Sequence, residues 1–113
     1  MYGEYAANAL QMLSNVQHKT LINCCKEFGI SVKWMEGYSS AEGYAAVIDG
    51  NAFIFLKRQH LKARVKDALA HELAHILLGH LGDWREIGGR ALPKEQQEDE
   101  ACRFVQLLQK SGW

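Results

Sequence analysis

The spacing of apolar residues divides the first half of the chain into a helical stretch followed by three short strands. Apolar residues recur at helical spacing from Tyr5 to Phe28, in one helix or in two that break near residues 18–20. Gly29 then follows as a typical helix end. Asp49 and Gly50, between the last two strands, are typical of a hairpin turn. The predicted strands are rich in β-branched and aromatic residues and cover residues 31–36, 44–49 and 51–57.

The second half of the chain carries two further helical patterns. Apolar residues almost surround the stretch from Leu69 to Leu78, which indicates a helix in the centre of the fold. Pro93 is typical of the first turn of another helix, and the acidic residues after it suit the positive end of the helix dipole. The sequence therefore predicts one α+β domain over residues 1–113. It comprises an N-terminal helix or helix pair, a small, mainly antiparallel three-stranded sheet, a central helix and a C-terminal helix.

The central helix contains the pattern H-E-x-x-H, at His71, Glu72 and His75. At about 100° per residue, the two imidazoles lie roughly 40° apart on one face, and Glu72 lies about 60° beyond His75. Two imidazoles so placed can bind one metal ion, and a carboxylate beside them can accept a proton from water. A solvated stripe is the other interpretation of so short a pattern, but polar groups on a buried helix need partners. We therefore predict a metal site.

This site needs a third protein ligand, for which the spacing leaves two candidates. The longer pattern H-E-x-x-H-x-x-G-x-x-H requires Gly and His where this chain has Leu78 and Leu81, so the metzincin class is excluded. His80 lies about 180° from His71 on a continuous helix, and it could bind the metal only if Gly79 turned the chain back. The other candidate is a carboxylate from the C-terminal helix.

Glu100 is the carboxylate that the spacing favours. It precedes apolar residues at the intervals i+4, i+7 and i+8, so its side chain is expected to point inward. Glu98 and Asp99 are expected to face solvent or the rim of the site. A buried carboxylate requires a cation, which is either the metal ion or an arginine such as Arg64 or Arg90.

These two helices resemble the ImmA/IrrE family of small zinc metallopeptidases. That family pairs a helix of the form A-H-E-L-x-H-x-L-x-G-H with a later helix of the form E-A-x-x-F-A-x-x-L-L. This chain carries the first at residues 70–80 and resembles the second over residues 100–108, with Val105 where the pattern has alanine. Residues 109–113 replace the family's usual Leu-Met-Pro. The resemblance implies a zincin-like core, Zn²⁺ as cofactor, Glu72 as general base, and three ligands: His71, His75 and Glu100.

The resemblance further implies hydrolysis of a peptide bond in a regulatory protein. Members from phages and other mobile elements cleave a partner transcriptional repressor, so a repressor is the implied substrate. The alternative is a non-proteolytic, zinc-stabilised module that acts by binding a regulator. The intact Glu72 favours chemistry, because a structural zinc ion needs no base.

Two further features of the predicted site stay open. A group that stabilises the oxyanion is expected, and the candidates are Tyr38, Tyr44, His60 and His80. A free strand edge beside the site could take an extended peptide as an additional strand, or every strand could simply cover the core.

Composition and charge indicate which partners and which cellular location to expect. The 113 residues include 13 basic and 13 acidic side chains, and the basic run over residues 57–66 lacks the aromatic residues and groove motif of nucleic-acid binding. We therefore expect no direct contact with nucleic acid. No apolar segment approaches the roughly 20 residues of a membrane span and no signal-peptide pattern is present, so we expect a cytoplasmic protein without a membrane partner. The three cysteines, Cys24, Cys25 and Cys102, lack metal-site spacing and are expected to be buried.

Overall fold

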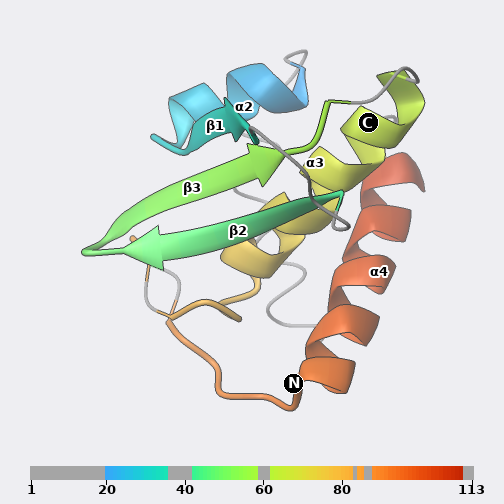
Figure 1. Cartoon of the computed structure of the whole chain (residues 1–113). Coiled ribbons are helices and arrows are strands. Elements are labelled where there is room, and N and C mark those ends of the chain that lie inside the picture. Colours follow the sequence, from blue (N-terminus) through green and yellow to red (C-terminus); the bar gives the residue numbers. More distant parts are fainter. Residues whose placement is uncertain (1–19, 36–41, 59–61, 83, 86–87, 111–113) are drawn as a thin grey trace.

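The structure is a computed structural model that describes residues 20–35, 42–58, 62–82, 84–85 and 88–110. It confirms an α+β fold in which helices precede and follow a three-stranded sheet (Figure 1). The helical pattern predicted from Tyr5 to residue 19 lies outside the described residues. The elements in chain order are α2 (Leu21–Glu27), β1 (Ser31–Trp34), β2 (Gly43–Ile48), β3 (Asn51–Leu56), α3 (Lys62–Leu77) and α4 (Lys94–Lys110).

The sheet is mixed, with strand order β1-β3-β2. β2 pairs antiparallel to β3, with Tyr44 opposite Phe55, whereas β1 pairs parallel to β3, with Val32 opposite Ile54. The prediction of a mainly antiparallel sheet is therefore corrected in this detail. The local pattern identified only the hairpin, and the direction in which β1 pairs with β3 depends on packing between distant segments. β2 consequently lies at one edge of the sheet.

The hairpin between β2 and β3 has the predicted turn. Asp49 and Gly50 adopt positive φ angles of 51° and 79°. This geometry is that of a type I′ turn, whose twist matches the twist of the two strands that it joins. Glycine adopts it without strain, and aspartate tolerates it better than most residues do.

Both ends of α2 follow from its sequence. Thr20 has an extended backbone, and its hydroxyl accepts a hydrogen bond from the backbone N–H of Asn23, so α2 begins directly after it. Gly29, with a φ of 75°, ends the helix as predicted. The N–H groups of Gly29 and Ile30 bond back to carbonyls of the last turn, which is the Schellman arrangement.

α3 is the central layer of the molecule, between the sheet on one side and α4 on the other (Figure 1). The inward side chains of β3, which are Ala52, Ile54 and Leu56, are buried in one core with residues of α3 and α4. The largest of these helix side chains that are fully buried are Leu73, Ile76, Leu77, Phe104 and Leu108. Among the described residues, no helix is both long and apolar enough to cross a membrane.

α3 ends in a turn that reverses the chain at Gly79, where φ is 77°. The N–H of His80 donates to the carbonyl of His75, so the residue after the glycine folds back along the last helical turn. The carbonyl of Gly79 accepts a hydrogen bond from the N–H of Arg90, and a Cβ at this position would collide with the carbonyl oxygen of Gly88. Only glycine suits this position, which holds His80 and Arg90 at the same end of α3.

Two of the three cysteines are buried as predicted. Cys24 and Cys25 are core residues of α2, and burial, together with the neighbouring Cys24, raises the pKa of the Cys25 thiol to about 12. Cys102 is exposed, contrary to the prediction. The reason is that it lies on the side of α4 that faces a cleft rather than the core.

Candidate metal centre

Two histidines of α3 place their ring nitrogens next to each other. The Nε2 atoms of His71 and His75 are 3.1 Å apart, and their rings meet edge to face. One helical turn separates the two residues, so this proximity follows directly from the H-E-x-x-H spacing. The side chain of His75 is 9% exposed and that of His71 is 28% exposed, so the pair lies where the core meets the surface.

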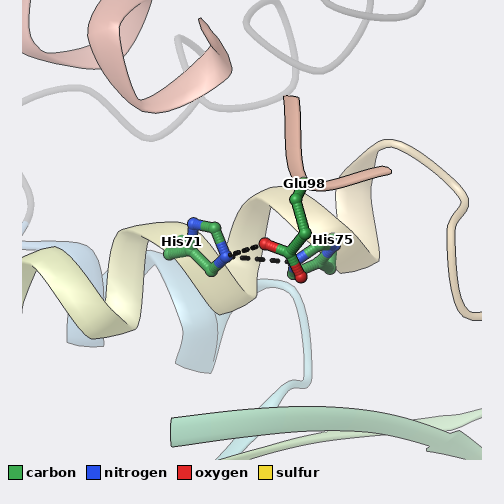
Figure 2. A group of neighbouring side chains, drawn as sticks. All are labelled: His71, His75 and Glu98. Atoms are coloured by element: carbon green, nitrogen blue, oxygen red, sulfur yellow. Dashed lines mark hydrogen bonds and ion pairs between the residues drawn. The ribbon is translucent and has the colours of Figure 1, made fainter. Parts of the chain in front are cut away.

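Glu98 of α4 completes the group. Its carboxylate oxygens lie 2.8 Å from Nε2 of His71 and 3.4 Å from Nε2 of His75. Figure 2 shows the Glu98 side chain extending from α4 toward the two rings on α3. Among the described residues, these are the one set of three or more histidine, cysteine or acidic side chains close enough to share a metal ion. We call His71, His75 and Glu98 the metal group.

The donor atoms fit a zinc ion in type and in spacing. Two imidazole nitrogens and one carboxylate oxygen are the ligands of a common type of catalytic zinc site. At zinc–ligand distances of about 2.1 Å, neighbouring ligands of a tetrahedral site lie about 3.4 Å apart. The two Nε2 atoms are 3.1 Å apart, and each lies within 3.4 Å of one of the two carboxylate oxygens of Glu98, so the spacing is close to that value. A fourth, open position would remain for water or substrate.

The structure does not bring Glu100, the predicted third ligand, into this group, in which Glu98 lies beside the two histidines instead. Glu100 is buried, as its spacing predicts, but its carboxylate accepts two hydrogen bonds of 2.7 Å from the guanidinium of Arg90. It accepts a third from Nε2 of His80, at 2.8 Å. The cation that satisfies Glu100 is therefore the arginine, which was the alternative interpretation.

The exchange of Glu98 for Glu100 follows from how α4 rests on α3. The apolar face of α4, which includes Phe104 and Leu108, points into the core, and Glu100 shares that face. The histidine pair lies at the margin of the core, so the residue that reaches it comes from the margin of the apolar face. A sequence signal for this exists, because the cleft-facing residues recur at helical spacing: Lys94, Glu98, Cys102, Val105 and Gln109.

An open cleft of about 790 Å³ lies over the metal group. Its floor is α3, with Asp67, Ala68, His71, Glu72 and His75; one wall is the start of β2, with Gly43 and Tyr44; and the other wall is α4. This volume lies within the range of about 300–1,000 Å³ that is typical of ligand sites. The cleft therefore has room for a substrate segment directly above the histidine pair.

Glu72 lines this cleft beside the two histidines and is not part of the metal group. Its carboxylate forms no hydrogen bond with the part of the chain that the structure describes. Burial raises the pKa of Glu72, and the charge of Glu98 adds to the rise, while His71 acts in the opposite direction. A carboxylate with a raised pKa is better suited to accept and return a proton near neutral pH.

His75 is held in its neutral form. Burial, followed by the neighbouring His71, lowers the pKa of His75 to about 4, although Glu98 acts in the opposite direction. A neutral imidazole is the form that binds metals. On the side away from the cleft, Nδ1 of His75 lies 2.8 Å from Nδ1 of His80.

Of the four predicted candidates for oxyanion stabilisation, the structure describes Tyr44 and His80. Tyr44 lines the cleft and is a candidate by position. The side chain of His80 is fully buried against Glu100, which removes it from the cleft. Tyr38 and His60 lie outside the described residues.

The sequence of this chain matches a known family. Residues 25–110 match the model of a peptidase family described as the IrrE N-terminal-like domain. The matched range includes the whole sheet, the histidine pair of α3, and all of α4. No curated protein and no solved structure matches the chain.

Proposed function

The chain belongs to the peptidase family of the IrrE N-terminal-like domain, and from this premise we propose that it is a zinc-dependent metallopeptidase that hydrolyses peptide bonds in the cleft above α3. The observation that carries the proposal is the convergence of His71, His75 and Glu98 from two helices, beside Glu72. Bound zinc would supply positive charge that acidifies water and polarises a carbonyl group.

Glu72 is the proposed general base. In this role its carboxylate takes a proton from the attacking water and later delivers that proton to the leaving amine. Its position one residue after His71 keeps it beside the ligands without binding the metal itself. Its raised pKa favours the second step, because a carboxyl group that holds its proton more firmly can act as an acid nearer to neutral pH.

The proposed substrate is an extended polypeptide that runs along β2. β2 is an edge strand, and no other described strand pairs with its outer edge. An edge of this kind can bind a peptide as an additional strand through backbone hydrogen bonds. A Cβ at Gly43 would lie 3.5 Å from Cγ of Glu72, so the start of β2 passes close to the proposed base. A peptide on this edge would therefore have its backbone near the zinc ligands.

A regulatory protein, such as the transcriptional repressor of a mobile element, is the proposed natural substrate. The family resemblance supports this proposal, and a repressor substrate would place the reaction in the cytoplasm. Cleavage of a purified repressor, compared with cleavage of an unrelated unfolded polypeptide of similar length, tests this level of specificity. Equal rates on both would contradict a dedicated regulatory substrate.

The decisive test of the peptidase activity is Glu72→Gln. This change preserves the shape of the side chain but removes the base, so we expect hydrolysis of a quenched-fluorescence peptide library to fall by about 100- to 10,000-fold. Zinc content, measured by metal analysis, is expected to stay at one ion per chain, because Glu72 is not a ligand.

Asp67→Asn is the matched control, because Asp67 lines the same cleft on the same helix but is not part of the metal group. We expect the decrease in hydrolysis caused by Asp67→Asn to be at least 10-fold smaller than the decrease caused by Glu72→Gln. If Glu72→Gln retains its zinc and its effect on a regulator, the protein acts as a zinc-stabilised binding module and the peptidase proposal fails.

A further inference from the structure

A buried chain of hydrogen bonds leads away from the metal group on the side opposite the cleft. From the site outward, Nδ1 of His75 meets Nδ1 of His80 at 2.8 Å, and Nε2 of His80 meets Oε1 of Glu100 at 2.8 Å. The carboxylate of Glu100 then accepts two hydrogen bonds of 2.7 Å from the guanidinium of Arg90. We name these three residues beyond His75, which are His80, Glu100 and Arg90, the relay.

The relay determines which nitrogens carry protons. Both oxygens of the Glu100 carboxylate face the guanidinium of Arg90 at 2.7 Å, and an ionised carboxylate paired in this way only accepts hydrogen bonds. Nε2 of His80 must therefore donate. A neutral imidazole with its proton on Nε2 has a lone pair on Nδ1, and that lone pair can accept the Nδ1–H of His75.

The buried ring of His80 lies against a carboxylate that already has its cation, Arg90. The side chain of His80 is fully buried, and a charge there would need an anion of its own. The negative charge of Glu100 is already matched by Arg90, whose side chain is 11% exposed. A second cation on the same carboxylate would be buried without a matching charge, which is costly.

We propose that the relay positions His75 for metal binding by fixing its tautomer, with the proton on Nδ1 and the lone pair of Nε2 directed at Glu98 and His71. His80 is thus a positioning residue rather than a ligand, and the turn at Gly79 brings its ring back to His75. This proposal rests on the proposed metal site. Hydrogen bonds that orient a ligating histidine typically change metal affinity by about 10- to 100-fold.

The first test uses the metal-free wild-type protein, with long-range ¹H–¹⁵N correlation spectra of the histidine rings. We expect the His75 ring to carry its proton on Nδ1 and the His80 ring to carry its proton on Nε2. A His75 ring protonated on Nε2 would overturn the proposal without any substitution, so the test does not depend on the folding of a variant.

The second test compares two substitutions of His80 by chelator competition for zinc. His80→Phe keeps a ring but removes the acceptor for Nδ1 of His75, and we expect about 10- to 100-fold weaker zinc binding and a mixture of His75 tautomers. His80→Asn places an amide oxygen near the former Nδ1 position, and we expect it to recover part of the affinity and the single tautomer. A merely structural role for His80 would not produce this rescue.

Leu108→Ala is the control for general destabilisation, because Leu108 is a buried core residue of α4 outside the relay. We expect it to lower the unfolding midpoint while leaving zinc affinity within about threefold of wild type. Unchanged zinc affinity in His80→Phe would overturn the relay proposal. If the wild-type protein binds no zinc, the proposed function fails instead, and the tautomer of His75 in the metal-free protein still decides the relay.

Discussion

Glu98 and Glu100 lie two residues apart on the same helix, yet they occupy opposite environments. The side chain of Glu98 is 46% exposed at the rim of the cleft and faces two imidazoles. The side chain of Glu100 is 5% exposed and is held by a guanidinium and by His80. A rotation of about 160° around α4 separates them and accounts for the difference.

This comparison shows why burial alone does not identify a metal ligand. A buried carboxylate must be matched by a cation, and at Glu100 the chain supplies that cation itself through Arg90. At Glu98 the described neighbours are the imidazoles of His71 and His75, which can share a cation with it. The carboxylate without a fixed cation is the better candidate for a ligand, because its oxygens remain available to an ion.

The largest effect that this comparison predicts is on folding stability. Glu100→Ala removes the carboxylate that accepts two hydrogen bonds from the mostly buried guanidinium of Arg90, so we expect a loss of about 3–5 kcal/mol in the free energy of unfolding of the metal-free protein. Glu98→Ala removes a half-exposed side chain, and we expect a loss below about 1 kcal/mol. Urea denaturation of the two variants in the presence of a chelator measures both. Equal losses would contradict the contrast between the two sites.

Zinc affinity should show the opposite order in a matched pair of conservative changes. Glu98→Gln replaces the proposed ligand with a neutral amide, and we expect zinc binding to weaken by more than about 100-fold, beyond the range for residues that only orient a ligand. Glu100→Gln should weaken it by about 10-fold, through the relay. Chelator competition at neutral pH compares the two. A larger effect at Glu100 would return the role of ligand to Glu100.

The smallest effect is a pH dependence of folding stability in the metal-free protein, to which His75 and Glu100 contribute in different pH ranges. Because the pKa of His75 is lowered to about 4 from an unfolded value near 6.5, only the unfolded chain takes up this proton as pH falls between those values, so stability decreases. The pKa of Glu100 is lowered from 4.5, so its contribution is lost only as pH falls below 4.5.

The raised pKa of Glu72 acts in the opposite sense above pH 4.5, because the folded protein then takes up the proton first. We therefore expect the decrease between pH 6.5 and 4.5 to be clearest in the Glu72→Gln variant. Adding His75→Gln should abolish it, whereas adding Glu100→Gln should affect only the part below pH 4.5. Urea midpoints across this pH range provide the measurement, and a slope that survives His75→Gln would refute its assignment.

Most of the local structure was predictable because its causes are local. Thr20, Gly29 and Gly79 define helix ends through hydrogen bonds to residues three to five positions away. The Asp49-Gly50 turn defines its hairpin in the same way. The parallel pairing of β1 with β3 was not predictable, since it depends on contacts between segments about twenty residues apart.

The histidine pair and the position of Glu72 beside it follow from the local sequence alone, because one helical turn places His71, Glu72 and His75 relative to one another whatever surrounds them. The sequence also determined that Glu100 would be buried. Which carboxylate meets the histidines and which meets Arg90 became clear only from the folded chain. The reason is that this choice depends on how α4 is rotated against α3, and that rotation is set by the packing of both helices in the common core.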